Sequence, residues 1–207
     1  MKKALVYLII CWLGSIGTYG VRPLGTSEGI RYEMWEPHDT IPSQLLNPAR
    51  EMYFASYDPR LHEGVSLEQM RIADKGFPSY EDFIADMLKR DFASYEAPAF
   101  RWIFFAYQER EIVGFASLLQ QPQSFYIDHF GVSSAAKGKK IGTRLMGHIF
   151  NHLSSFWREG LPHEVTLDTR VFNVPAQAFY DKMHFKGVNP HPDPAKEGAY
   201  LHYRRPF

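Results

Sequence analysis

The sequence predicts a mixed α/β (α+β) domain, in which helices pack on one sheet. Apolar residues alternate with polar ones over several short segments, as in strands, and recur every three to four residues over others, as in helices. Strand-like segments lie on both sides of helical ones along the chain, so helices connect strands of one mixed sheet. At 207 residues the chain is long enough for one domain with a sizeable core.

The N-terminal residues differ from the rest. A short basic start precedes an unbroken apolar run over residues 4–13, and small residues follow. This order is typical of a bacterial signal peptide, with cleavage after Gly17 or Gly20. A membrane anchor, an upstream extension and a helix lying on the domain stay open as alternatives. We therefore assign residues 1–28 to a hydrophobic leader and residues 29–207 to the domain.

The first part of the domain combines a strand with helical segments. Residues 29–36 alternate apolar and polar side chains, which predicts a strand that Pro37 ends. Residues 44–57 and 66–94 carry two or three helical segments, broken at prolines and glycines. Ser79 precedes two acidic residues and is expected to cap the last of these helices.

Three strands are expected in the middle of the chain. Residues 100–107 and 112–119 are apolar segments joined by a polar turn, which predicts a hairpin. Residues 125–132 are almost entirely apolar, and such a run is typical of a central strand that is buried on both faces.

The last part alternates helices with strands. Apolar residues at helical spacing predict a helix over residues 142–157, and alternation predicts a strand over 164–172. A short helix at 175–183 and strands at 185–188 and 200–204 follow. No internal repeat or low-complexity linker divides the domain.

Composition excludes several classes of protein. Of all residues, 45% are hydrophobic and 22% are charged, which excludes disorder as the main state. Lysine plus arginine (23) equals aspartate plus glutamate (23), so no overall charge attracts nucleic acid. Cys11 is the only cysteine, which excludes an intrachain disulfide and a zinc site built from several cysteines.

A loop rich in lysine and glycine lies between residue 132 and the following helix. A helix N-terminus exposes unpaired N–H groups and the positive end of the helix dipole, and it therefore attracts anions. Gly138 and Gly142 let phosphate oxygens approach the main chain, while nearby lysines and Arg144 add positive charge. The loop predicts an anion site, and an ordinary solvated loop stays open as the alternative.

This loop and a second segment together resemble the GNAT family of N-acetyltransferases. The family's acyl-CoA motif falls on Val132, Lys137, Lys140 and Gly142. Lys137 stands where the family has arginine or glutamine, and Lys140 stands where it has its first glycine. In the second segment His184 stands where glycine is usual, and the matching positions are Asn173, Ala176, Phe179, Tyr180, Lys182 and Phe185. The resemblance covers residues 29–207. It implies a mixed, mostly antiparallel sheet of six to seven strands flanked by about four helices.

The resemblance also implies acetyl-CoA as co-substrate. Its pantetheine arm would lie between the strands of residues 125–132 and 164–172 and pair with main-chain groups like an added strand. Its diphosphate would bind N–H groups of the lysine-rich loop. The implied cofactor-binding residues are Phe130, Val132, Lys137, Gly138, Lys139, Lys140, Ile141, Gly142, Thr143, Asn173 and Tyr180.

Acetyl transfer to an amine needs a neutral amine, a hydrogen-bond donor for the oxyanion and a proton for the leaving thiolate. We assign the oxyanion to the Val132 N–H, and the resemblance implies Tyr180 as the proton donor. Asp128 is the candidate base, because alternation puts it on the face of Phe130 and Val132 and burial is expected to raise its pKa. A structural role for Asp128 stays open, and a bulge would reverse the choice between it and His129.

His148 and His152 lie one helical turn apart, but no third ligand is evident, so no metal is expected.

The predicted protein is a cytoplasmic N-acetyltransferase that acts on a primary amine of a small molecule or peptide. A non-catalytic acyl-CoA-binding module and an exported binding protein are the alternatives. Membrane contact through residues 4–21 and the oligomeric state stay open.

Overall fold

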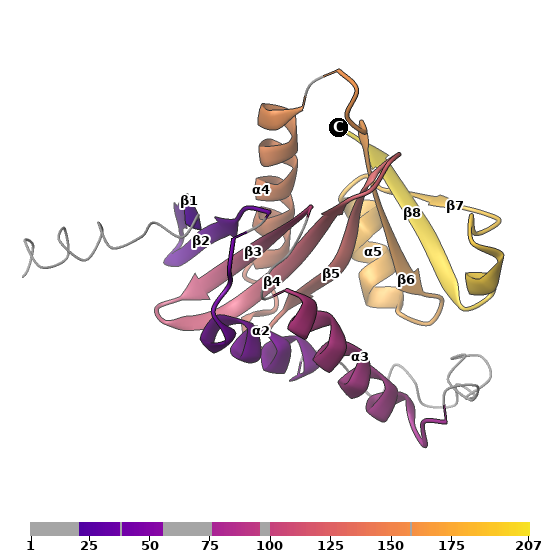
Figure 1. Cartoon of the computed structure of the whole chain (residues 1–207), viewed down its shortest axis with the longest axis horizontal. Helices are drawn as coiled ribbons and strands as arrows, with labels where there is room; N and C mark the ends of the chain where they lie inside the picture. The colour runs from indigo at the N-terminus through magenta and orange to yellow at the C-terminus, as the bar shows by residue number, and fades with distance from the viewer. Residues whose placement is uncertain (1–20, 38, 56–75, 96–99, 158) are drawn as a thin grey trace, which may run out of the picture.

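An eight-stranded mixed sheet forms the centre of the computed structural model, which describes residues 21–37, 39–55, 76–95, 100–157 and 159–207. The strand order is β1-β2-β3-β4-β5-β6-β8-β7 (Figure 1). The strands are β1 (Val21–Ser27), β2 (Ile30–Trp35), β3 (Arg101–Gln108), β4 (Glu111–Gln120), β5 (Phe125–Val132), β6 (Glu164–Arg170), β7 (Lys186–Val188) and β8 (Tyr200–Pro206). The helices of the described residues are α2 (Ser43–Ala55), α3 (Tyr80–Ser94), α4 (Ile141–Phe156) and α5 (Val174–Lys182), with 3-10 turns η3 (Ser134–Ala136) and η4 (Pro194–Lys196).

Each neighbouring pair of strands is antiparallel except β5 and β6, which are parallel. Helix α4 connects this parallel pair, because a parallel connection must cross over the face of the sheet. The expectation of a mixed, mostly antiparallel sheet flanked by helices is therefore confirmed. The sheet has one strand more than expected.

The additional strand is β1, which lies in the segment that we assign from sequence to the leader. It pairs antiparallel with β2 from Val21 opposite Trp35 to Ser27 opposite Ile30, with a register shift between Pro23 and Gly25. The fold thus includes residues before Gly29, whereas residues 1–20 lie outside the described part. Among the described residues, no helix is long and apolar enough to cross a membrane.

Hydrophobic clusters cover both faces of the sheet. Helices α4 and α5 pack on one face, where α4 contributes Leu145, Ile149 and Leu153. Helices α2 and α3 pack on the other face, as Figure 1 shows. Successive residues of β3 alternate between the two clusters, because strand side chains point to opposite faces. This arrangement explains why the strand reads as an unbroken apolar run.

Local signals set the helix boundaries. The Ser79 hydroxyl accepts a hydrogen bond from the Asp82 N–H at 3.1 Å, which confirms the expected cap of α3. Asn173 caps α5 in the same way, accepting from the Ala176 N–H at 3.4 Å, and Pro175 lies in the first turn. The parts of the expected helices at residues 56–57 and 66–75 lie outside the described residues.

Candidate active site

Strands β5 and β6 separate shortly after they begin. Their parallel pairing joins Phe125 to Val165, Tyr126 to Thr166 and Ile127 to Leu167, and it continues through no later described residue of either strand. The edge of β5 from residue 128 to 132 therefore has no pairing with β6, although the other edge remains paired with β4. An extended ligand that adds like a strand needs an unpaired edge of this kind.

The lysine-rich loop leads directly from this open edge into α4. Gly138 has φ 83° and Lys140 has φ 58°, and the helix begins at Ile141. The first main-chain bond of the helix runs from the Arg144 N–H to the Lys140 carbonyl at 3.0 Å. The N–H groups of residues 141–143 precede that bond and are free to bind an anion. Lys137, Lys139 and Lys140 are exposed around them.

Both residues that replace a family glycine adopt the left-handed conformation. Lys140 has φ 58° at the start of α4, and His184 has φ 64° just after α5. Glycine is the residue that takes this conformation without a steric penalty. Both positions thus hold a side chain in a conformation that favours glycine, and the Lys140 side chain is exposed rather than filling the loop.

We expect His184→Gly to raise the free energy of unfolding by about 1 kcal/mol, because glycine removes the left-handed strain at a helix C-terminus. Denaturant titration followed by circular dichroism measures the change. The matched control is Asp181→Gly, an exposed position inside α5, where glycine should destabilise by about 1 kcal/mol. A lower stability for His184→Gly would contradict the expectation.

A bulge in β5 decides which way the candidate bases face. Ser117 pairs with His129 and Leu118 pairs with Ile127, so Asp128 is the extra residue. Beyond it, Phe130 packs with the α4–α5 cluster, whereas the Asp128 and His129 side chains both contact Tyr95 next to α3. The prediction that Asp128 shares a face with Phe130 and Val132 is therefore wrong, because the extra residue reverses the alternation.

Asp128 lies in a network of polar groups. Its Oδ2 accepts hydrogen bonds from the Arg101 guanidinium at 2.6 Å and from the Tyr95 hydroxyl at 2.9 Å. The same hydroxyl lies 2.6 Å from His129 Nδ1. Burial raises the pKa of Asp128, but the hydrogen bonds and charges of His129 and Arg101 outweigh it and hold the pKa well below its usual range. The expected rise of this pKa is wrong, and the carboxylate is ionised.

Tyr180 lies on α5 and faces the sheet. Its side chain is 8% exposed, and its ring packs against those of Phe185 and Tyr203, with centroids 5.9 and 5.8 Å away. The hydroxyl makes no hydrogen bond with another described residue. Burial raises the pKa of Tyr180 far above neutrality, with a smaller contribution from Tyr203. The hydroxyl is thus a protonated donor that is free to bind a ligand.

The structure reveals a second polar cluster that the sequence did not predict. Asp168 comes directly after the last β6 residue that pairs with β5. Its carboxylate accepts hydrogen bonds from Tyr126, Lys196, His202 and His191. Burial raises the pKa of Asp168, but its bonds to His202 and Lys196 outweigh it and keep the pKa well below its usual range. The cluster lies next to the point where β5 and β6 separate.

A cavity of about 380 Å³ lies elsewhere, between α2 and the β3–β4 turn. Its walls include Met52, Tyr107, Arg110 and Ser133, and none of the predicted acyl-CoA-binding residues. Met52 is partly buried and packs against the α2–α3 cluster as well as lining this cavity.

The histidine pair of α4 packs among aromatic rings. His148 lies against Tyr32 with centroids 4.6 Å apart, and His152 lies 5.7 Å from Trp102. Burial lowers the pKa of His152 to about 4, with a smaller contribution from Arg22. Within the described part of the chain, neither histidine belongs to a group of three or more metal-ligating side chains.

Comparison with known proteins shows the family. Residues 64–185, more than half of the chain, match the model of the acetyltransferase (GNAT) family. The chain therefore belongs to the GNAT family and is an acyltransferase. No curated protein matches the sequence significantly. The family resemblance of the two sequence motifs is confirmed.

Solved structures share the fold at low sequence identity. The PaiA N-acetyltransferase of Thermoplasma acidophilum, in complex with coenzyme A, is 14% identical with a TM-score of 0.55, and the match covers 85% of this chain and 99% of that one. The ribosomal-protein-S18-alanine N-acetyltransferase of Escherichia coli is 16% identical with a TM-score of 0.54, over 84% and 93% of the two chains. An acyl-CoA N-acyltransferase of Pseudomonas aeruginosa is 16% identical with a TM-score of 0.52, over 85% and 99%.

Proposed function

We propose that this acyltransferase moves an acetyl group from acetyl-CoA to a primary amine of a small molecule or peptide, by direct attack in a ternary complex. One observation supports this function above all. The unpaired edge of β5 runs into a loop whose helix N-terminus has free N–H groups. A strand edge suits the amide-containing pantetheine arm, and a helix N-terminus suits the diphosphate.

The binding residues follow from this placement. The main chain of Phe130 and Val132 on the open edge of β5 would pair with pantetheine. The segment from residue 137 to residue 143 would bind the diphosphate, with its exposed lysines adding positive charge. Asn173 would act indirectly, because its side chain caps α5 and so fixes the helix that carries Tyr180.

The chemistry uses groups on either side of the sheet. The amine nitrogen attacks the thioester carbon, the Val132 N–H stabilises the oxyanion, and the Tyr180 hydroxyl protonates the departing sulfur. The bulge puts Asp128 and His129 on one face of the sheet, and Asp128 remains the proposed base because its side chain is 29% exposed whereas that of His129 is 3% exposed. As an ionised carboxylate it would stabilise the positive charge on the attacking nitrogen, whose proton would be released to solvent.

Two measurements on the full-length chain test this function. Calorimetry with coenzyme A is expected to show binding at one site, and a screen of primary amines with acetyl-CoA is expected to show thiol release. Arg110→Ala, at the separate cavity, is a control that should bind coenzyme A like the wild type. Binding without thiol release for any amine would favour the non-catalytic module. The absence of binding would reject both the acetyltransferase and the non-catalytic module, and it would favour the exported binding protein.

The proposed place of action is the cytoplasm, because acetyl-CoA is the proposed substrate and is expected there rather than outside the cell. Fractionation of cells that express the full chain tests this location. A mature N-terminus near residue 18 or 21 in an external fraction would contradict it.

A further inference from the structure

Three metal-ligating side chains from separate segments converge on one point beside β6. Asp168 Oδ1 lies 3.2 Å from His191 Nε2 and 2.8 Å from His202 Nδ1. One donor atom from each of the three residues lies within 4.8 Å of the other two. Tetrahedral zinc with bonds of about 2.0–2.1 Å holds its ligands roughly 3.3 Å apart, so small shifts would admit an ion.

The three side chains are shielded from solvent, as ligands of a stable site usually are. Asp168 is 6% exposed, His191 is 3% exposed and His202 is 15% exposed. Asp168 lies on β6, His202 lies opposite it on β8, and His191 lies in the loop between β7 and β8. An ion bound here would join two strands and a loop. Because strand register and the loop fix the side chains, little ordering is needed for binding.

His191 Nδ1 keeps a hydrogen bond to the Asp193 main chain in either tautomer of the ring. The Asp193 N–H donates to His191 Nδ1 at 3.0 Å, and the Asp193 carbonyl oxygen lies at the same distance from Nδ1. With Nδ1 as acceptor, Nε2 carries the proton and donates to Asp168. With Nδ1–H donating to the carbonyl, Nε2 offers its lone pair to a metal, which is the usual arrangement around metal-bound histidines. The Glu197 carboxylate accepts from the His191 main-chain N–H at 2.6 Å and fixes the loop.

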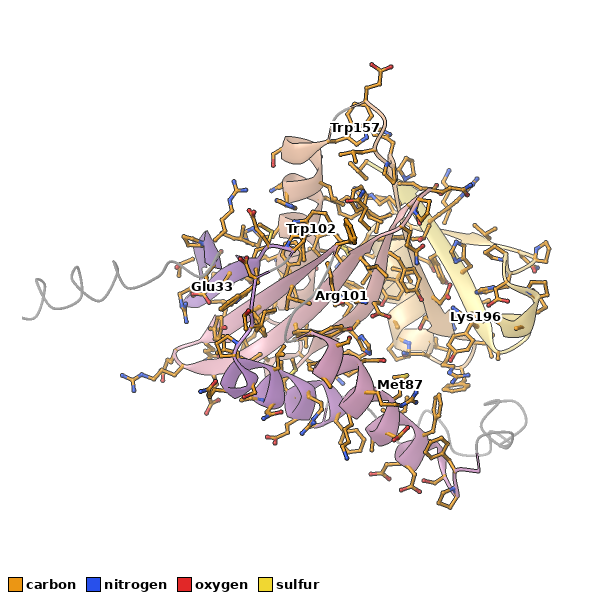
Figure 2. All side chains as sticks on the ribbon, viewed as in Figure 1. Glu33, Met87, Arg101, Trp102, Trp157 and Lys196 are labelled. Atoms are coloured by element: carbon orange, nitrogen blue, oxygen red, sulfur yellow. The ribbon has the colours of Figure 1, made fainter. Side chains whose placement is uncertain are left out.

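The second oxygen of Asp168 is held by groups that would lie outside the metal site. Asp168 Oδ2 accepts from Lys196 Nζ at 2.5 Å and from the Tyr126 hydroxyl at 3.2 Å. The Lys196 side chain is 37% exposed and extends from η4, so it can move into solvent; Figure 2 shows it near β8. The positive charge of Lys196 opposes the binding of a cation at Asp168 Oδ1. Lys196 therefore competes with the cation, and substitution of Lys196 removes this competition.

We propose that Asp168, His191 and His202 form a binding site for a divalent transition-metal ion, and that zinc fits the donor set best. Two imidazole nitrogens and one carboxylate oxygen are ligands that zinc accepts, and three protein ligands leave one coordination position open. The sequence predicts no metal here, because the three residues are separated along the chain and match no compact ligand motif. The site is independent of the proposed acetyl transfer.

The test measures metal binding by the untagged full-length protein after dialysis against a chelator. Competition with a chromophoric zinc indicator is expected to show one tightly bound zinc ion per chain, and cobalt is expected to give the visible absorption of a low-coordinate site. His202→Gln keeps a polar side chain but removes the ligand nitrogen, and it should weaken zinc binding on the order of 100-fold. His191→Ala should have a similar effect. Lys196→Met should strengthen binding several-fold, because it removes the competing charge.

Control variants keep the result interpretable. His148→Ala and His184→Ala, outside the cluster, should bind zinc like the wild type. Circular dichroism and coenzyme A calorimetry show that each variant is folded, so a folding defect is not counted as a lost ligand. The proposal is overturned if the wild type binds no zinc, or if folded His191→Ala and His202→Gln both bind it unchanged. Neither result would affect the proposed acetyl transfer.

Discussion

Tyr180→Phe is expected to lower kcat by about 100-fold or more, a typical loss when a proton donor is removed. The hydroxyl is buried, protonated at neutral pH and without a hydrogen bond to the described residues, so its removal leaves no partner unsatisfied. Phenylalanine keeps the ring contacts with Phe185 and Tyr203. Stability and coenzyme A affinity should therefore change little, and the loss should fall on the chemical step.

Tyr203→Phe is the matched control for Tyr180→Phe. Tyr203 is 5% exposed, and its ring lies 5.8 Å from that of Tyr180, but it belongs to β8 and has no proposed role in the reaction. Steady-state thiol release with the best amine from the screen gives kcat and KM for all three proteins. A normal rate for Tyr180→Phe, or an equal loss for Tyr203→Phe, would remove Tyr180 from the mechanism.

Gly142→Asp is expected to weaken coenzyme A binding on the order of 100-fold, because it puts a negative charge where the diphosphate is proposed to bind. A Cβ at this position would lie 3.5 Å from the Phe130 ring, 3.5 Å from Val132 and 3.6 Å from the Phe179 ring, which are ordinary contacts. An acidic residue in the first turn also favours the helix. The fold should therefore persist while the anion site is lost.

Gly142→Ala separates the effect of charge from that of volume. The same contacts accommodate its methyl group, so its dissociation constant for coenzyme A should stay within a few-fold of the wild type. Calorimetry at two salt concentrations measures both variants, and the penalty for aspartate should shrink at the higher one because salt screens the repulsion. Wild-type affinity for Gly142→Asp would show that the diphosphate binds elsewhere.

The sequence predicts those strands and helices in which apolar residues recur with one clear period. The alternation of residues 164–172 and the helical spacing of residues 142–157 both correspond to real elements, β6 and α4. Strand β1 was missed for the opposite reason. It contains Pro23 and Gly25, most of its side chains are at least partly exposed, and it follows an apolar segment that is typical of a leader. The regular pattern of a half-buried strand is absent there.

The orientation of the Asp128 side chain shows a different limit of prediction from sequence. Inserting one residue into a strand moves every later side chain to the other face, and the local sequence of β5 gives no sign of the insertion. The bulge is visible only in the register with β4. The low pKa of Asp128 is only partly a local effect, because the neighbouring His129 lowers it together with Arg101, which lies 27 residues earlier in the chain. Figure 2 shows Arg101 over the middle of the sheet.

The cluster around Asp168 depends entirely on long-range contacts. Tyr126, His191 and His202 reach the carboxylate from three other segments of the chain. No local spacing connects them, and the sequence predicts only that Asp168 lies on a strand. The acyl-CoA loop, in contrast, lies within a single stretch of chain, where spacing and local conformation are readable together. A single sequence therefore reveals sites that lie within one stretch of chain, as this loop does.

The outer edge of the sheet at β1 has a consequence for how copies of the protein meet. A bare strand edge can recruit a strand from a neighbouring molecule and so start aggregation. Here Pro23 lacks an amide hydrogen, and the irregular register between Pro23 and Gly25 bends the edge. In the described part of the sheet, both features disfavour the addition of a strand from another copy at this edge.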